Sequence, residues 1–250
     1  MSAALSLMER RRHLFVFGHM RSYSSLLCHI LGSHSEIDGY CETHIKYRWP
    51  LDLLRLRRRV VALTGEPLGG RYVLDKVLHD YPVTKSILRS PAARGVVLLR
   101  RPGATVRSIM NMGLRYSDIP WYRDVDAVAR YYETRLSSLV RIADEMQGRA
   151  VLLEAEELLA NTPAVLQRLG GFLELGQPLQ RSYRRFAHTG EAGYGDPSDN
   201  ISKGEAIAPA SAGHGTGSES LIVIPEPIVT RLERVYRACS AALRERCIRS

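Results

Sequence analysis

Residues 95–99, GVVLL, form an uninterrupted apolar run between two arginines, and this run constrains the fold most strongly. A continuous stretch rich in Val and Leu is typical of a central strand in a parallel sheet, where both faces are buried. Comparable apolar runs occur at 13–17 and from Ala150, with helical periodicity between them. This alternation indicates βα units, so the sequence predicts an α/β fold of three layers with a central parallel sheet.

The other expected elements follow from periodicity and from turn residues. The pattern predicts an extended segment at 37–41, a cationic surface helix within 50–61 and a short strand followed by polar residues within 71–80. Further helices are expected at 24–32, 82–88, 103–114, 125–146, 161–173 and 226–248. We expect a serine to cap the first of these helices and Gly32 to end it, and Thr162 to cap the helix at 161–173.

The length of 250 residues and a hydrophobic content of 45% suit a single domain spanning 1–250. Between 187 and 220, glycine, serine and proline replace most large apolar residues, which predicts a long flexible loop. No apolar run is long enough for a membrane span, and the N-terminal apolar stretch is too short for a signal peptide. These features favour a cytoplasmic protein.

The formal net charge of +9 comes mainly from arginine, whose planar guanidinium matches phosphate and sulfate oxygens. The basic residues are scattered and lack interleaved aromatic platforms, so nucleic acid is not the expected partner. The four cysteines show neither CxxC pairs nor zinc-like spacing. Neither a metal site nor a disulfide framework is therefore predicted.

A polar loop follows the apolar run that ends before Gly18, and a helical pattern begins at Ser24. The first N–H groups of a helix lack intrahelical partners, and the helix dipole is positive there, which favours an anion. Arg21 would add a cation to those donors, and Ser24 and Ser25 would add hydroxyls. The loop lacks the GxxxxGK[ST] pattern, which argues against ATP or GTP hydrolysis.

A second cluster follows the buried strand at 95–99. Arg100 stands at its carboxyl end, and Ser108 lies eight residues later on the following helix. In an open parallel sheet, ligands bind at this edge. Two strand ends, each with an arginine and a hydroxyl, suggest a ligand that carries two separated phosphates.

Together these motifs resemble the sulfotransferase family that uses 3′-phosphoadenosine 5′-phosphosulfate, in style closest to its bacterial, tyrosylprotein-type and glycan-type members. The family motif [KR]-S-G-[ST]-[ST] is similar to RSYSS at 21–25, and R-x-P-x-x-x-x-x-S matches the spacing from Arg100 to Ser108. A strand, an acidic turn and a helix ending in FL-x-L resemble residues 151–175. The resemblance covers about residues 13–175 and implies a P-loop nucleotide-hydrolase-like sulfotransferase fold.

The resemblance also implies the cofactor, 3′-phosphoadenosine 5′-phosphosulfate, and the residues that hold it. The first motif is expected to bind the 5′-phosphosulfate, and the second the 3′-phosphate. The loop at 187–220 lies where family members cover the cofactor and shape the acceptor pocket. It is expected either to order on cofactor binding or to be a solvated linker. The implied cofactor-binding residues are Arg21, Ser22, Tyr23, Ser24, Ser25, Arg100, Ser108, Lys203 and Gly204.

Three residues are implied to be catalytic. Glu42, in GYCETHI, corresponds to the family's carboxylate base, and Lys76, in VLDKVLHD, to a lysine near the transferred group. Arg21 would stabilise charge on the leaving phosphate together with Lys76. Two other interpretations stay open: Glu42 as a surface or capping carboxylate, and Lys76 with Asp75 as a solvated pair. Because other members use a histidine base, His19, His44 and His79 remain candidates.

Tyr23 departs from the family pattern, which has glycine at this position. A positive φ would strain a tyrosine by roughly 1–3 kcal/mol. Either the loop follows a different path, or Tyr23 leans over the transfer site and contacts the acceptor, and we favour contact with the acceptor. A Tyr23→Gly variant that changed cofactor affinity more than acceptor affinity would instead place Tyr23 in the phosphate cradle.

The resemblance implies transfer of a sulfuryl group to a hydroxyl, or to an amine, of a small molecule, glycan or peptide tyrosine, without a metal. An ATP-dependent small-molecule kinase and a catalytically silent nucleotide-binding relative are the alternatives, and a homodimer is compatible with the sequence. Variable regions at 44–70, 113–130 and 187–220 would line the acceptor pocket. Their aromatic residues and arginines suit an aromatic or an anionic acceptor; the aromatic residues are Tyr47, Trp49, Tyr116, Trp121 and Tyr122.

Overall fold

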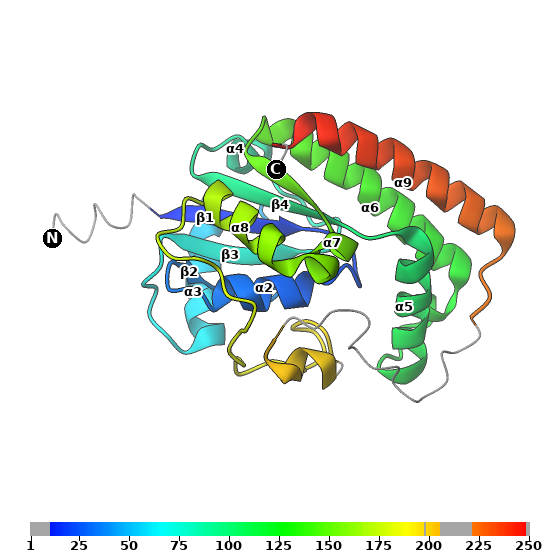
Figure 1. Cartoon of the computed structure of the whole chain (residues 1–250), viewed down its shortest axis with the longest axis horizontal. Coiled ribbons are helices and arrows are strands. Elements are labelled where there is room, and N and C mark those ends of the chain that lie inside the picture. The colour runs from blue at the N-terminus through cyan, green and yellow to red at the C-terminus, as the bar shows by residue number, and fades with distance from the viewer. Residues whose placement is uncertain (1–10, 198, 206–221, 249–250) are drawn as a thin grey trace, which may run out of the picture.

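A five-stranded parallel sheet forms the centre of the molecule in the computed structural model, which describes residues 11–197, 199–205 and 222–248 (Figure 1). The strand order is β2-β3-β1-β4-β5, and each pair of neighbours runs parallel. The strands are β1 (Arg12–Phe17), β2 (Ile37–Asp38), β3 (Tyr72–Val77), β4 (Ala93–Leu99) and β5 (Ala150–Glu154). The predicted α/β class and central parallel sheet are confirmed.

Helices cover both faces of the sheet and complete the three layers. The long helices α6 and α9 lie side by side on one face, and α2, α7 and α8 lie on the other (Figure 1). The helices are α2 (Ser24–Gly32), α3 (Asp52–Thr64), α4 (Lys85–Leu88), α5 (Pro102–Arg115), α6 (Val125–Met146), α7 (Ala155–Ala160), α8 (Thr162–Phe172) and α9 (Glu226–Arg246), with 3-10 turns η1 (Pro120–Arg123) and η2 (Asp199–Lys203).

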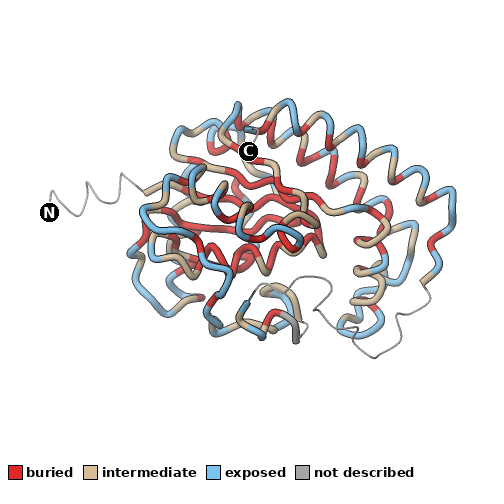
Figure 2. Tube along the Cα trace, in the orientation of Figure 1, coloured by how far each residue is buried: buried red, intermediate tan, exposed pale blue. Residues whose placement is uncertain are grey.

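The two cores follow from the alternation of side chains along each strand. In β1, Phe15 and Phe17 face the α6 and α9 side, whereas Leu14 and Val16 face α2 and α8. Figure 2 shows the buried residues concentrated along the strands and on the inner faces of the helices. The sheet is thus buried on both sides, as the run at 95–99 predicts.

Several predicted boundaries need correction. The extended segment at 37–41 is a strand over Ile37–Asp38 alone, because Gly39 has a φ of 102° and turns the chain away. Asp75 and Lys76 lie inside β3 rather than after it. The helix expected from 82 begins at Lys85, since Thr84 is extended and Val83 bridges to Tyr47.

The two predicted N-terminal caps are wrong, whereas α2 ends at Gly32 as expected. Tyr23, rather than a serine, precedes α2, and Asn161 precedes α8. The Thr162 hydroxyl instead donates to the carbonyl of Leu158, at the end of the preceding helix. Gly32 ends α2 for a packing reason, because a Cβ there would lie 2.3 Å from the carbonyl oxygen of Gly39.

The strand order places a topological switch at β1. The chain passes from β1 to β2 and β3 on one side and then crosses to β4 and β5 on the other. The crevice between the carboxyl ends of β1 and β4 is where ligands bind in open α/β sheets. Both predicted anion-binding segments, the loop at 18–23 and Arg100, follow these two strands. Among the described residues, no helix has the length and hydropathy needed to cross a membrane.

Candidate active site

The loop after β1 leads directly into the N-terminus of α2. Arg21 and Tyr23 both have positive φ, at 62° and 61°, and this conformation reverses the chain within a few residues. The buried Ser22 hydroxyl donates to the carbonyl of His19 at 2.7 Å and so closes the turn from within. Tyr23, the residue before α2, makes no capping hydrogen bond with its side chain, and no other side chain of the described residues caps the first N–H groups of α2. Those donors and the positive end of the helix dipole favour an anion in front of the helix.

Arg100 ties the end of β4 to this loop. Its guanidinium donates to the carbonyl of Arg21 at 2.8 Å and to the hydroxyl of Tyr23 at 3.0 Å. The guanidinium carbon lies 4.4 Å from the centre of the Tyr23 ring, a cation–π contact. Burial lowers the pKa of Arg100, although a guanidinium stays protonated in proteins. Tyr23 therefore contacts Arg100, the residue predicted to bind the 3′-phosphate, and its contact with the acceptor stays a prediction.

Arg21 lies between α5 and the covering segment, which we define as residues 186–197. Its Nε donates to the Ser108 hydroxyl at 3.0 Å, and its Nη1 pairs with the Asp196 carboxylate at 2.8 Å. Both predicted arginines and the hydroxyl of the second motif thus gather at one place. In this position the Arg21 guanidinium forms an ion pair with the oxygen of an anionic group, the Asp196 carboxylate.

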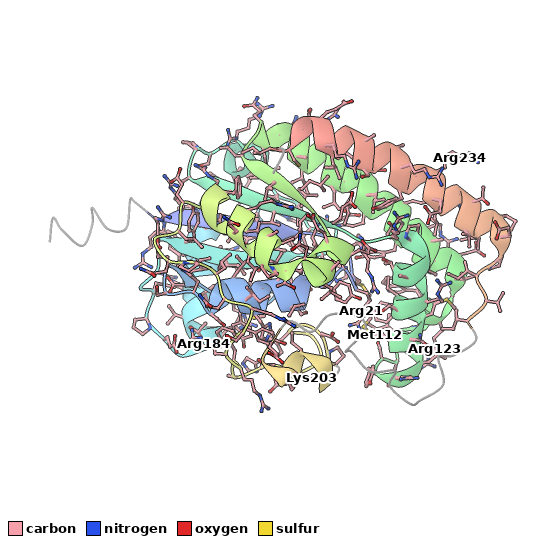
Figure 3. The ribbon with its side chains drawn as sticks, viewed as in Figure 1. Arg21, Met112, Arg123, Arg184, Lys203 and Arg234 are labelled. Carbon is pink, nitrogen blue, oxygen red and sulfur yellow. The ribbon has the colours of Figure 1, made fainter. Side chains whose placement is uncertain are left out.

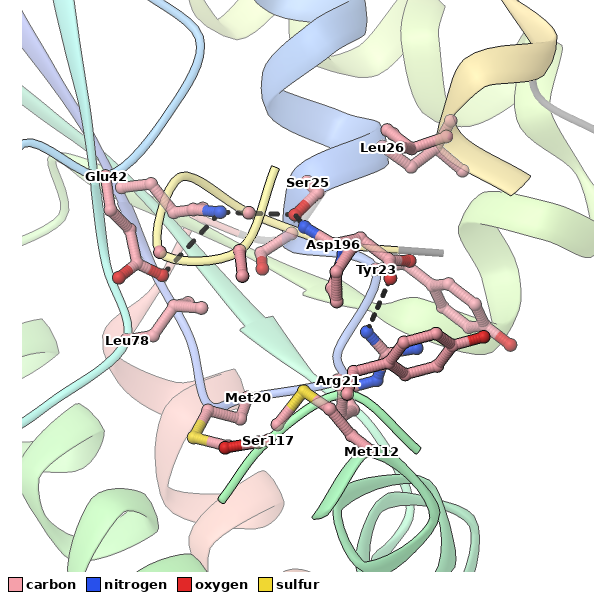
Figure 4. A pocket seen from close by; sticks show the side chains of 18 of the residues that line it. Met20, Arg21, Tyr23, Ser25, Leu26, Glu42, Leu78, Met112, Ser117 and Asp196 are labelled. Atoms are coloured by element: carbon pink, nitrogen blue, oxygen red, sulfur yellow. Dashed lines mark hydrogen bonds and ion pairs between the residues drawn. The ribbon is translucent and has the colours of Figure 1, made fainter. Parts of the chain in front are cut away.

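A polar chain runs from the start of α2 to the segment after β2. The Ser25 hydroxyl accepts hydrogen bonds from the Asp196 backbone N–H at 2.9 Å and from Lys76 Nζ at 3.2 Å. Lys76 Nζ also lies 3.6 Å from Glu42 Oε1 (Figure 4). Lys76 is 2% exposed and Glu42 8% exposed. The interpretations of Lys76 as solvated and of Glu42 as a surface carboxylate are therefore wrong.

Asp75 positions the segment that carries Glu42. Its buried carboxylate accepts from the Thr43 backbone N–H at 2.9 Å, the Thr43 hydroxyl at 2.8 Å and the Tyr47 hydroxyl at 2.5 Å. Burial raises the pKa of Asp75 to about 6, against these hydrogen bonds, which act to lower it. The carboxylate fastens residues 43–47 to β3, so Glu42 is held beside Lys76.

The three candidate histidines differ in their burial and in their hydrogen-bond and ion-pair partners. His19 is fully buried, donates from Nδ1 to the Met20 carbonyl and accepts the Arg100 backbone N–H at Nε2. Burial lowers its pKa to about 4, so it is a neutral link between β1 and β4 with both ring nitrogens occupied. It is thus unsuited to act as a base. His44 Nδ1 lies 3.6 Å from Glu42 Oε2, and burial lowers the pKa of His79, which also lines the cavity.

The covering segment is anchored to α2. The Thr189 hydroxyl donates to Nε2 of His29, whose Nδ1 donates to the Ser25 carbonyl. At Gly195 a Cβ would lie 2.9 Å from Ser25 Oγ and 3.4 Å from Lys76 Nζ, so the backbone comes close to the polar chain. Residues 206–220 of the predicted loop lie outside the described residues, and loop flexibility stays a prediction.

These groups surround a cavity of about 760 Å³. In Figure 3, Arg21, Met112 and Lys203 gather around it, whereas Arg184 and Arg234 lie elsewhere on the surface. Of the predicted site residues, those that line the cavity are Arg21, Tyr23, Ser24, Ser25, Glu42, Lys76, Arg100 and Lys203. Ser22, Ser108 and Gly204 are not among the lining residues: Ser22 faces inward, Ser108 meets Arg21, and the Gly204 carbonyl accepts from the Tyr183 N–H.

Sequence reasoning missed Asp75, Asp196 and Gly195 as site residues. The sequence pattern predicts a strand that ends before Asp75, whereas Asp75 lies inside β3 with its carboxylate buried. The Gly-Asp-Pro stretch at 195–197 is the only local signal for Asp196 in the sequence, since glycine and proline favour a turn there.

The acidic turn at 154–157 has a structural role, because Glu154 pairs with Arg244 and Glu157 pairs with Arg168. Within the described part of the chain, no three His, Cys, Asp or Glu residues are placed to hold a metal ion.

Comparisons with known structures find the same fold. A sulfotransferase domain of the Synechococcus PCC 7002 olefin synthase matches with a TM-score of 0.57 and 19% identity, over 91% of this chain and 95% of that one. The sulfotransferase domain from the curacin biosynthetic pathway matches with a TM-score of 0.52 and 15% identity, covering 92% and 98% of the two chains. A sulfotransferase from Alicyclobacillus acidocaldarius has a TM-score of 0.55 and 14% identity, covering 94% and 95%.

Neither the family models nor the curated proteins include a match to this sequence. At these identities the structural likeness defines the fold. The protein has the α/β fold of sulfotransferase domains, and the fold predicted from the motif resemblance is confirmed.

Proposed function

We propose that this protein is a sulfotransferase that moves a sulfuryl group from 3′-phosphoadenosine 5′-phosphosulfate to an acceptor hydroxyl. The observation that carries the proposal is the meeting of Arg21, Arg100 and the uncapped N-terminus of α2 at the topological switch of a sulfotransferase fold. The partly buried guanidinium groups and free helix N–H donors fit a ligand with two anionic ends. The cavity of about 760 Å³ has room for a nucleotide and an acceptor.

Different residues would bind the two anionic ends of the nucleotide. The loop at 18–23, with Ser24 and Ser25, would hold the 5′-phosphosulfate end against α2. Arg100, kept in place by Tyr23, would bind the 3′-phosphate, and Ser108 would orient Arg21. Lys203 lines the same cavity from η2 and would add a cation at the nucleotide end.

The cofactor supplies a sulfuryl group whose bond to a phosphate oxygen breaks as the acceptor oxygen bonds to sulfur. Lys76 and Arg21 would stabilise the negative charge that develops on the phosphate and sulfuryl oxygens. Glu42 would accept the hydroxyl proton, and its Oε1 lies 3.6 Å from Lys76 Nζ. Neither a metal ion nor a covalent bond to the protein enters this scheme.

Calorimetric titration with adenosine 3′,5′-bisphosphate and with ATP tests the proposal. We expect the bisphosphate to bind and ATP with magnesium to bind much more weakly. Arg100→Ala should weaken bisphosphate binding roughly ten- to hundredfold, because a charge-assisted hydrogen bond is lost. Arg94→Ala, at the opposite end of β4, is the matched control and should bind normally.

Preference for ATP would instead support a small-molecule kinase. Binding of neither nucleotide would support a silent relative. Either result would contradict the proposed sulfotransferase function.

A further inference from the structure

The cavity has two chemically different ends. The start of α2 lies on one side of Arg21, and an apolar wall lies on the other. We define the apolar wall by its lining residues, which are Met20, Leu78, Met112, Ile119, Trp121 and Tyr122. Figure 4 shows Met20, Leu78 and Met112 grouped on the side of Glu42 and Arg21 that faces away from α2.

The apolar wall is built from fixed positions. The Tyr131 hydroxyl accepts the Met20 backbone N–H and donates to the Leu78 carbonyl, both at 2.8 Å, so it holds these two residues next to each other. At Gly113, a Cβ would lie 2.6 Å from the Cβ of Tyr122, which shows how closely η1 packs on α5. The wall therefore exists before any acceptor arrives.

The cationic side chains near the apolar wall already have hydrogen-bond or ion-pair partners within the protein. Lys76 faces Glu42 and donates to Ser25, and it is 2% exposed. Arg123, on the same turn as Trp121, donates to the carbonyls of Gly113 and Ser117 and does not line the cavity. Among the described lining residues, α5 and η1 contribute no arginine or lysine. Arg21, which borders the wall, pairs with the Asp196 carboxylate. Among the described lining residues, an anionic acceptor would thus find no unopposed arginine or lysine on this side.

The wall continues to the molecular surface. Tyr116 and Ile119 line the cavity and are 50% and 43% exposed. Exposed apolar side chains beside a binding cavity extend the area that an apolar ligand can cover. The acceptor's body can therefore be longer than the cavity is deep.

We propose that the acceptor is an uncharged alcohol carried on an apolar chain or ring. Its hydroxyl lies at Glu42 and its apolar body lies along the wall, where methionine side chains adapt to different shapes. This inference rests on the proposed function and decides between the two acceptor classes that the sequence left open, because it excludes the anionic class. Of the aromatic residues expected in the pocket, Tyr47 is fully buried against Asp75 and Trp49 points to solvent, so neither contributes.

A matched pair of acceptors tests the proposal. Octanol and octanol that carries a terminal carboxylate share a hydroxyl and a chain length, and they differ in the far end of the chain, which is a methyl group in one and an anionic carboxylate in the other. The chain has two tryptophans, and Trp49→Phe leaves Trp121 in the wall as the fluorescent reporter. Titrations are made with protein saturated with adenosine 3′,5′-bisphosphate, after calorimetry has established that the bisphosphate binds.

We expect octanol to bind at least tenfold more tightly than its carboxylated form. Met112→Lys should reverse this preference, whereas Leu114→Lys, on an exposed position of the same helix, should leave it unchanged. Met112→Leu should retain octanol binding. Bisphosphate affinity should stay the same in all three variants.

Equal or tighter binding of the carboxylated form, or no binding of octanol to the bisphosphate complex, would overturn the apolar-acceptor inference and leave the proposed function standing. Failure of the bisphosphate itself to bind would overturn the proposed function, and the inference with it.

Discussion

Tyr23 shows at the scale of a single residue how a strained position is used. Its φ of 61° is costly for a tyrosine, by roughly 1–3 kcal/mol, and the ring and hydroxyl recover part of this through Arg100. A glycine would adopt the same backbone without strain but would leave the guanidinium unsupported. The strained backbone of Tyr23 therefore lowers local stability, while its side chain holds the Arg100 guanidinium in position.

Tyr23→Gly should leave the free energy of unfolding within about 1 kcal/mol of the original, because relief of strain offsets the lost cation–π contact. Affinity for adenosine 3′,5′-bisphosphate should fall roughly five- to tenfold, since Arg100 loses a partner. Denaturant unfolding and calorimetry measure the two quantities. An unchanged affinity for the bisphosphate together with weaker acceptor binding would instead indicate that Tyr23 contacts the acceptor.

Glu42→Gln removes the proposed proton acceptor while keeping its shape. Turnover should fall by about 10²–10⁴, the usual contribution of a positioned base, and bisphosphate affinity should change little. The rate is followed as formation of adenosine 3′,5′-bisphosphate with the fastest alcohol of a panel. Glu66→Gln, an exposed carboxylate paired with Arg184, serves as control. Full activity of Glu42→Gln would assign the base elsewhere, with His44 and His79 the next candidates.

At the scale of elements, the covering segment makes close contact with α2 through Gly195. A methyl group there meets Ser25 Oγ at 2.9 Å, and moving that hydroxyl breaks its bonds to Lys76 and Asp196. Gly195→Ala should therefore displace the segment, raise protease sensitivity near 186–197 and lower bisphosphate affinity. Gly170→Ala, in α8 with open space around the site, should instead raise stability by about 0.5–1 kcal/mol. Unchanged protease sensitivity in Gly195→Ala would show that the contact is not required.

Helices and strands with a clear period were predictable from the sequence. The helix at Val125–Met146 agrees with its expected bounds, because its apolar stripe repeats over many turns. Caps were not predictable, since Tyr23 enters the left-handed region for a tertiary reason, its contact with Arg100. The polar partners of Asp75 and of Arg21 lie far away in the sequence, and no local pattern encodes them. Motif spacing brought Arg21, Arg100 and Ser108 together; the distances to Asp196 and Glu42 required the fold.

At the scale of the whole molecule, buried histidines couple folding to pH. Burial lowers the pKa values of His13, His19 and His29 to about 4, below the usual 6.5. In this window the unfolded chain binds more protons than the folded one, so stability is full above pH 6.5 and falls as the pH drops toward 4. Asp75 acts in the opposite sense, because its pKa is raised to about 6 and its contribution is lost as the pH rises through that value. These three histidines, together with His79, whose pKa burial also lowers, oppose one aspartate, so acid should destabilise the protein.

Urea unfolding at pH 7, 5.5 and 4.5 measures this dependence. We expect the free energy of unfolding to fall at each step. Between pH 7 and 4.5 each histidine whose pKa is lowered to about 4 should contribute roughly 1–3 kcal/mol to this fall. His29→Gln should reduce the slope, since it removes one of the three groups. A free energy that stays constant or rises toward pH 4.5 would contradict the account.

The central claim is that the site recognises a nucleotide by its 3′-phosphate, and one comparison of affinities tests it most directly. Adenosine 3′,5′-bisphosphate and adenosine 5′-phosphate differ only in that group, and calorimetry gives the dissociation constant of each for the original protein and for Arg100→Ala. We predict that the original protein prefers the bisphosphate by at least tenfold and that Arg100→Ala loses most of this preference. Equal affinities of the original protein for the two nucleotides would contradict the claim.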